Sequence, residues 1–233
     1  MIILLAAAVL PAIYLLSRVY KMDTIEKEPW SILRKLLLWG AISGIPAALV
    51  ESLLTGVVQS VFAEGTLAYN LVFGFVVAAL VEESFKFFFL YKFTFKSPDF
   101  NYRFDGVVYA VFVSMGFAIL ENILYVFQGG LGVAVTRALL ALPLHAACGV
   151  YMGIAYGQQK VNSLYKPASF TSVAAACLPV PILIHGFYDF CAFMQTIPFA
   201  IIFIVFVIAV FIITLKQLKK ASQEDAPVNE VTL

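Results

Sequence analysis

Apolar residues form long continuous runs along this chain, separated by short polar segments. A helical run of about 20 apolar residues crosses the ~30 Å hydrocarbon core of a bilayer. Seven runs reach about that length, at approximately residues 1–20, 36–62, 67–91, 105–128, 132–157, 171–191 and 196–215. Because the runs are continuous rather than alternating, they indicate helices and not the strands of a membrane barrel. The pattern predicts an all-α polytopic transmembrane helix bundle with about seven spans.

The pattern leaves no room for a separate soluble domain. We expect one integral membrane domain over residues 1–215 and a disordered cytoplasmic tail over residues 216–233, where the sequence KQLKKASQEDAPVNEVTL is polar. The second run contains Gly40, Gly44 and Pro46, so we expect that helix to be tilted or kinked. Glycines in the runs also suit close contact between helices.

Positive charges fall on one side of the predicted spans. Thirteen of the 15 Lys and Arg residues lie at or after the ends of the first, third and fifth runs or in the tail: Arg18, Lys21, Lys27, Arg34, Lys35, Lys92, Lys96, Arg103, Lys160, Lys166, Lys216, Lys219 and Lys220. Cytoplasmic loops of membrane proteins are enriched in these residues. The distribution predicts an N-terminus outside the cell and a C-terminus in the cytoplasm.

The composition agrees with a membrane protein and argues against a soluble domain, a nucleic-acid-binding protein and a disulfide-rich protein. The chain is 62% hydrophobic and 12% charged, whereas soluble domains carry about 25% charged residues. A net charge of +1 gives no reason to expect nucleic acid as a partner. Cys148, Cys177 and Cys191 lie in apolar runs without a CxxC spacing, so we expect small core residues rather than disulfides or thiolate metal ligands. The lipid bilayer is the expected surroundings of the protein.

Ionisable side chains within membrane spans are costly and usually mark function. In this chain they are Glu51, Glu82, Glu83, Lys86, Glu121, His145, His185 and Asp189. With a rise of ~1.5 Å per residue from the cytoplasmic helix ends, four of them fall within one ~10 Å layer near the midplane. These four are Glu82, Glu83, His145 and His185, and Glu121 and Asp189 lie further out.

Helical spacing indicates which of these groups meet. Lys86 follows Glu82 by four residues and Glu83 by three, so its ammonium can reach either carboxylate. Asp189 lies on the same helix face as His185 and can orient its ring.

Three further polar residues, Glu121, Asn122 and Glu51, have less specific predicted roles. Glu121 is expected to contact substrate or support the bundle, with pairing to Arg137 as an alternative. Asn122 beside it both donates and accepts hydrogen bonds. Glu51 is expected to cap a helix or pair within the bundle.

The residue types favour hydrolysis by an activated water. Two adjacent carboxylates in a low dielectric do not both ionise easily, so one of the pair is expected to hold a proton. A carboxylate poised in this way takes a proton from water and returns it later, and histidine N–H groups stabilise an oxyanion. No serine or cysteine nucleophile pair and no HExxH motif is present. Two alternatives stay open: a proton-coupled transporter that uses the same groups as a relay, and a non-catalytic membrane scaffold.

Four polar motifs together resemble a known family. EESFK (82–86), FDGVVYAVFVSMGFAILEN (104–122), LHAACG (144–149) and HGFYD (185–189) occur in that order. Over about residues 70–192, the pattern resembles the PrsW family of bacterial intramembrane proteases, which is related to the CAAX prenyl endopeptidases and the bacterial Abi proteins. The resemblance implies a multi-pass protease of the bacterial plasma membrane that cuts a membrane-anchored protein substrate. The best-known activity of that family is site-1 cleavage of an anti-sigma factor, the first step of a stress response by regulated intramembrane proteolysis.

The resemblance also implies a role for each motif residue. Glu82 would be the general base and Glu83 its partner, while His145 and His185 would position water or stabilise the oxyanion. The supporting residues would be Lys86, Glu121, Asn122 and Asp189. Lys86 stands one position before the arginine of the related families, and Asp189 stands where many relatives have asparagine.

The resemblance leaves the role of a metal open. The PrsW family has been classed as metal-dependent, and Glu82, His145 and His185 would then bind zinc with one position open for water. We expect a metal-free glutamate mechanism without a cofactor, because no two histidines have the usual i,i+4 ligand spacing. Zinc bound by the same residues stays an alternative.

Overall fold

The computed structural model describes residues 1–230, and its regular elements in that range are helices apart from one isolated β-bridge. The α-helices are α1 (Ile2–Met22), α2 (Trp30–Val61), α3 (Leu67–Val72), α4 (Val81–Thr94), α5 (Asp105–Leu139), α6 (Ala141–Asn162), α7 (Phe170–Cys177), α8 (Pro179–Met194) and α9 (Ile197–Gln223). The π-helix η1 (Phe73–Leu80) joins α3 directly to α4, and the short 3-10 helix η2 (Val228–Glu230) follows α9. The predicted all-α class is confirmed.

Four stretches within residues 1–230 are long and apolar enough to cross a membrane. They are α1, α2, α9 and the stretch Asp105–Asn162, which contains both α5 and α6. The pair α7 and α8, bent by 47° at their junction, would make a fifth. The sequence predicts seven spans. The structure gives four or five candidate spans rather than seven, because α5 and α6 fall in one stretch and because the third run is divided among α3, η1 and α4.

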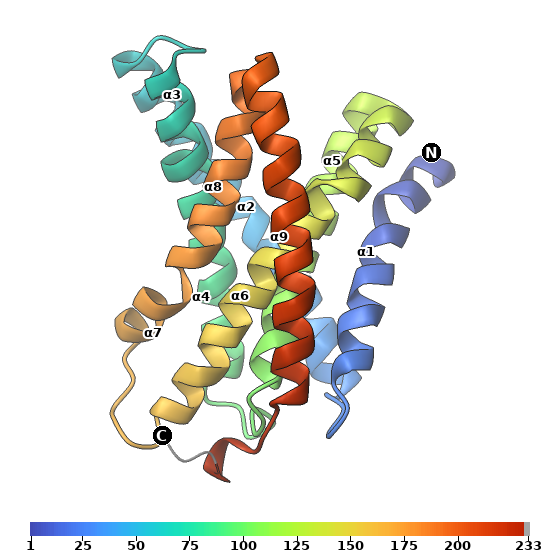
Figure 1. The fold of residues 1–233 in the computed structure, drawn as a ribbon, viewed down its shortest axis with the longest axis vertical. Helices are drawn as coiled ribbons and strands as arrows, with labels where there is room; N and C mark the ends of the chain where they lie inside the picture. The colour runs from blue at the N-terminus through green and yellow to red at the C-terminus, as the bar shows by residue number, and fades with distance from the viewer. Residues whose placement is uncertain (231–233) are drawn as a thin grey trace.

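α5 and α6 meet at a different place from the predicted boundary. Gly130 has φ 75° and ψ −162°, which interrupts the helix, and the helix then resumes and continues to Leu139. Ala134 in the segment after Gly130 packs against Ala8 of α1 and Val126. Figure 1 shows the segment at the upper end of α5, near the N-terminal half of α1. α6 therefore begins at Ala141, later than the predicted start near residue 132.

α5 is the central helix of the bundle, since its side chains from Asp105 to Ala118 are buried. Its neighbours approach closely because glycines occupy the crossings. A Cβ atom on Gly116 would lie 2.2 Å from the Leu37 carbonyl oxygen of α2. On Gly153 of α6 it would lie 2.4 Å from the Val107 Cα of α5. Small residues allow such contacts between membrane helices, as predicted.

α2 is one continuous helix that includes Pro46, and the expected tilt or kink of this helix stays a prediction. The prediction for the polar tail needs correction. The polar tail is ordered as far as residue 230, because α9 extends into it and later residues contact the loop before α5. The Val228 N–H donates to the Asn101 carbonyl at 2.7 Å, and Asp225 accepts a hydrogen bond from the Phe104 N–H at 2.8 Å. The prediction of a disordered tail is wrong for residues 216–230, and its last part, 231–233, lies outside the described residues.

Buried carboxyl groups hold the loop between α1 and α2. Glu28 is 2% exposed and accepts a hydrogen bond from the Tyr109 hydroxyl at 2.5 Å. Burial raises the pKa of Glu28 to about 7, although the bond from Tyr109 opposes the shift. Burial likewise raises the pKa of Asp23 to about 6. Both groups therefore hold their protons more tightly in the folded protein than in the unfolded chain.

We predict that the stability of the protein falls as the pH rises through about 7. A carboxyl group whose pKa is raised on folding, as that of Glu28 is from 4.5 to about 7, stabilises the fold below its unfolded pKa and loses that contribution above its folded pKa. Thermal unfolding in detergent micelles over this pH range measures the effect. Glu28→Gln should flatten the pH dependence in part, because Asp23 still titrates, whereas Glu64→Gln at an exposed site should leave it unchanged. Equal slopes for Glu28→Gln and the unmodified protein would contradict this prediction.

Candidate active site

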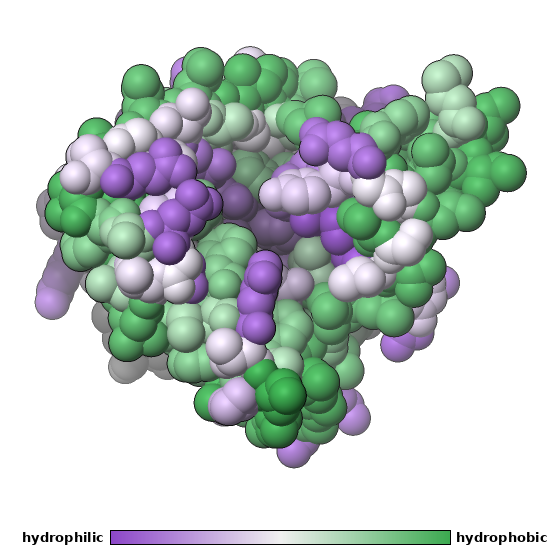
Figure 2. Space-filling view, turned by 90° about the horizontal axis from the view of Figure 1, so that it is seen from above, coloured by the Kyte–Doolittle hydropathy of each residue, from purple (hydrophilic) through white to green (hydrophobic). Residues whose placement is uncertain are grey.

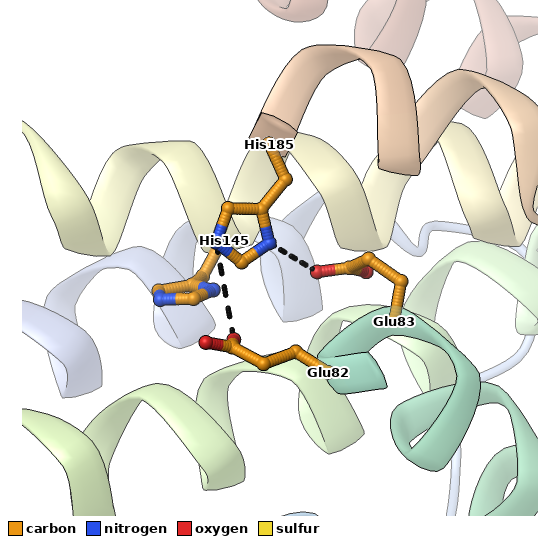
Figure 3. A group of neighbouring side chains, drawn as sticks. All are labelled: Glu82, Glu83, His145 and His185. Carbon is orange, nitrogen blue, oxygen red and sulfur yellow. Dashed lines mark hydrogen bonds and ion pairs between the residues drawn. The ribbon is translucent and has the colours of Figure 1, made fainter. Parts of the chain in front are cut away.

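Glu82, Glu83, His145 and His185 meet in the interior of the bundle. The glutamates lie in the first turn of α4, His145 on α6 and His185 on α8, and their side chains point toward one another (Figure 3). One nitrogen or oxygen atom from each residue lies within 4.8 Å of those of the other three. All four residues are buried. The structure thus brings together the four residues that the sequence places at one level of the membrane.

The π-helix η1 sets the position of the two glutamates. It ends directly before α4, and π-helical segments are rare and often lie at functional sites. Two glycines let η1 and α8 touch. A Cβ atom on Gly74 would lie 2.9 Å from the Phe190 nitrogen, and one on Gly186 would lie 2.4 Å from the Phe75 ring. This close contact brings His185 beside Glu83, and nothing in the hydrophobic pattern predicts the π-helix.

The Lys86 ammonium lies at the centre of the polar cluster and is fully buried. Its Nζ donates to Glu83 Oε1 at 2.8 Å and to Glu82 Oε2 at 3.0 Å, so the predicted reach to both carboxylates is confirmed. It also lies 3.2 Å from His145 Nδ1, a contact that spacing alone did not predict. An ammonium has three donors and no acceptor, so these partners use its full capacity.

His185 is fixed on one side by Glu83. Its Nδ1 lies 2.9 Å from Glu83 Oε1, and because a carboxylate accepts hydrogen bonds, Nδ1–H is the donor. Its Nε2 lies 3.4 Å from Asp189 Oδ2 and 3.9 Å from Glu82 Oε2. The predicted contact between His185 and Asp189 is therefore present, but Glu83 makes the shorter bond to the ring.

Both ring nitrogens of His145 are occupied. Nδ1 accepts from Lys86, and Nε2–H donates to Glu121 Oε2 at 3.0 Å, which together describe a neutral ring. His145 therefore has no free N–H in this arrangement with which to stabilise an oxyanion, the role that the resemblance implies. His185 Nε2 is the ring atom that remains directed toward Glu82 and Asp189.

The supporting residues connect the cluster to the N-terminal half of α1 and the C-terminal part of α5. Arg137, in the segment after Gly130, lies 2.7 Å from Glu121 Oε2, which confirms the pairing that the sequence left as an alternative. Its Nε donates to Asn122 Oδ1 at 2.9 Å, and Asn122 Nδ2 donates to the Ala8 carbonyl at 2.7 Å. These contacts make the polar cluster continuous with the packing of α1.

A cavity of about 470 Å³ adjoins the cluster, and the upper face of the molecule is hollowed near its middle, with polar side chains in and around the hollow (Figure 2). The ionisable groups that line the cavity include Glu51, Glu82, Glu121, Arg137, His145, His185 and Asp189. Glu83 and Lys86 lie behind this wall with no exposed surface. Of the adjacent glutamates, Glu82 is therefore the one that faces the cavity.

Glu51 differs from its prediction. It lies on α2 at the cavity wall, and its Oε1 is buried without a hydrogen-bond partner. No other group within residues 1–230 forms an ion pair or hydrogen bond with its carboxyl group. The prediction that Glu51 caps a helix or pairs within the bundle is wrong.

The four side chains could bind zinc, because they are of the right chemical types and their ligand atoms lie close together. Two imidazoles and two carboxylates gather within 4.8 Å, and these are the ligand types that zinc takes in catalytic sites. The Lys86 ammonium, however, already bonds to Glu82 Oε2 and His145 Nδ1. A zinc ion held by these same atoms and His185 would compete with Lys86 for their lone pairs.

Comparisons with known proteins agree on one family. Residues 28–215 match the family model described as PrsW family intramembrane metalloprotease. The Protease PrsW of Oceanobacillus iheyensis is 32% identical over 225 residues, which cover 96% of this chain and 98% of that protein. The Protease PrsW of Geobacillus kaustophilus is 36% identical over 190 residues, 80% of this chain and 78% of that protein. The Protease PrsW of Bacillus subtilis is 32% identical over 82% of this chain and 83% of its own. No solved structure matches the chain.

We predict that Lys86→Met destabilises the protein by about 3–5 kcal/mol, because it leaves the buried Glu83 carboxylate without its ammonium partner. The double variant Glu83→Gln with Lys86→Met should be more stable than Lys86→Met alone, since it removes the uncompensated charge. Unfolding in mixed micelles of the unmodified protein, both single variants and the double variant gives the coupling energy. Additive effects of the two substitutions would show that the ion pair contributes nothing.

Proposed function

The chain belongs to the PrsW family of intramembrane proteases and is a peptidase, and on this basis we propose that it is an endopeptidase of the bacterial plasma membrane that cuts a membrane-anchored protein. The observation that carries the proposal is the cavity wall. It presents one glutamate of an adjacent pair, Glu82, beside a histidine whose second nitrogen is directed into the same space.

In the proposed reaction, Glu82 is the general base. It takes a proton from a water molecule in the cavity, and the oxygen of that water attacks the scissile carbonyl carbon. His185, when protonated, donates Nε2–H to the oxyanion that forms. Glu82 then gives its proton to the leaving amine as the C–N bond breaks, which restores the carboxylate. Glu83 Oε1 lies 2.9 Å from Nδ1 and Asp189 Oδ2 lies 3.4 Å from Nε2, so both carboxylates can accept hydrogen bonds from the imidazolium.

The remaining polar residues position these two groups. Lys86 holds Glu82 in place and offsets its charge, and Glu83 orients the His185 ring through Nδ1. His145 links Lys86 to Glu121, so we assign it a positioning role. Its occupied nitrogens do not support the oxyanion contact that the family resemblance implies.

Seven helical units are the arrangement that we propose for the membrane. Three of the units are composite or bent, namely α3 with η1 and α4, α5 with its kink at Gly130, and α7 with α8. The N-terminus and η2, the last described element, lie at opposite ends of the bundle (Figure 1), which agrees with an odd number of spans. The connections from α1 to α2, from α4 to α5 and from α6 to α7 lie at the same end of the bundle as η2 (Figure 1). They carry Lys27, Arg103 and Lys166, which supports an N-out, C-in orientation.

This orientation bears on the substrate. The hollow of Figure 2 lies at the end opposite the basic loops, so the cavity would open on the extracytoplasmic side. That position suits an initial cut on the outer side of a single-span protein. We therefore propose an anti-sigma factor as the substrate, with cleavage as the first step of regulated intramembrane proteolysis in a stress response.

A zinc-dependent form of the same activity is the second candidate. Two observations favour it: the cluster of four ligand atoms within 4.8 Å and the metalloprotease description of the matching family. Glu82, His145 and His185 would hold the ion, which supplies a Lewis acid for the water when bound. The bonds from Lys86 to Glu82 and His145 support the metal-free form, because they already provide a cation at these atoms.

We predict that Glu82→Gln and His185→Ala each lower cleavage of a membrane-anchored substrate by at least about 100-fold, since each removes a group that acts in the transition state. Products are measured by mass spectrometry with purified protein in nanodiscs, and immunoblots of membranes report the amount of each variant. Glu64→Gln, at an exposed site, serves as the control and should keep full activity. Cleavage that persists in both Glu82→Gln and His185→Ala would refute the proposed mechanism.

A second measurement separates the metal-free and metal-dependent forms. We expect the purified protease to keep its activity after dialysis against a chelator, because Lys86 supplies the local positive charge without an ion. Metal content by mass spectrometry is measured on the same samples. Loss of activity on chelation that zinc restores would overturn the metal-free mechanism.

A further inference from the structure

The charged groups of the cavity wall are paired, with one exception. Of the four carboxyl groups that line the cavity, three have a basic partner. Glu82 lies 3.0 Å from Lys86, Glu121 lies 2.7 Å from Arg137, and Asp189 lies 3.4 Å from His185. Glu51 has no such partner within the described residues, and its Oε1 is buried.

A buried carboxyl oxygen without a partner, such as Oε1 of Glu51, is costly, because it has lost contact with water and gained no hydrogen bond. Among the described residues that line the cavity, the basic side chains are those of His145, His185 and Arg137. Arg137 is already bound by Glu121 and Asn122. Within residues 1–230, the wall therefore lacks a free cation for Glu51. A ligand that brings a positive group into the cavity would supply what the protein itself does not.

The shape of the wall beside Glu51 suits an incoming segment. Gly44 and Ala48 line the cavity on the same face of α2, at positions seven and three residues before Glu51. Gly44 has no side chain and Ala48 has only a methyl group, so this face of α2 is apolar beside Glu51. At ~1.5 Å per residue, Glu51 lies ~31 Å from Trp30 and ~15 Å from Val61, in the half of α2 nearer the outer hollow.

We propose that Glu51 is a specificity-determining residue that binds a Lys or Arg side chain of the substrate on the outer side of the scissile bond. The inference rests on the proposed protease function and adds a substrate preference to it. A lysine or arginine stem lies along an apolar wall such as that of α2 while its charged head reaches a carboxylate. The other acidic groups of the cavity, Glu82, Glu121 and Asp189, add to the attraction for a cation.

The test measures binding without turnover. The full chain with Glu82→Gln is placed in nanodiscs and titrated with single-span peptides that have a Leu and Ala core and a fluorescent label. One residue is varied among Lys, Leu and Glu, and its position is moved along one helical turn at the outer end. We expect the Lys peptide to bind about tenfold more tightly than the Leu peptide at one of these positions, as one charge-assisted hydrogen bond allows.

Substitution of Glu51 shows whether the preference depends on it. Adding Glu51→Gln, which keeps the shape of the side chain, should abolish the difference between Lys and Leu peptides, and Glu51→Lys should favour the Glu peptide. Glu64→Gln is the matched control at an exposed site and should leave the preference intact. A Lys preference that survives Glu51→Gln, or no Lys preference at any position, would overturn the inference. Because the readout is peptide binding rather than product formation, loss of the Lys preference would leave the proposed cleavage mechanism standing.

Discussion

The buried ammonium of Lys86 is the interaction on which the site depends. Two carboxylates and a histidine lie within 3.2 Å of its Nζ, in a part of the bundle that excludes water. Removing ions from water costs several kcal/mol for each one, and attraction between them offsets that cost only when the geometry is good. The partners come from α4 and α6, and His185 of α8 joins through Glu83. Three helices must therefore keep their relative positions for the charges to remain compensated.

Backbone contact provides that positional precision. Lipid is as apolar as leucine, so membrane helices associate through close packing and hydrogen bonds rather than through the hydrophobic effect. Gly74 and Gly186 bring η1 onto α8, and Gly153 brings α6 onto α5. Ser114 of α5 adds a hydrogen bond to the His145 carbonyl at 2.7 Å. A catalytic group on such rigid elements is held in place before substrate arrives, which is the condition for efficient acid–base chemistry.

Several parts of the site could be read from the sequence because they depend on local geometry. The contacts of Lys86 with Glu82 and Glu83 follow from helical spacing, and the common level of His145 and His185 follows from the helical rise. Other parts depend on contacts between distant segments. The bond from Lys86 to His145, the kink at Gly130 and the order of residues 216–230 belong to this second group. Side-chain spacing carries no information about them.

The sequence by itself determined the class of the molecule, the order of its polar motifs and the residue types that can activate water. Long apolar runs permit only helices in a bilayer, and charge within them is retained only for a reason. The tertiary structure decided which of those residues face the cavity and which are buried or paired. It turns Glu82 toward the cavity and buries Glu83 behind it, occupies both nitrogens of His145, and leaves Glu51 without a partner. The physical reason is that burial and pairing depend on which side chains meet across helices, and only the packed bundle fixes that.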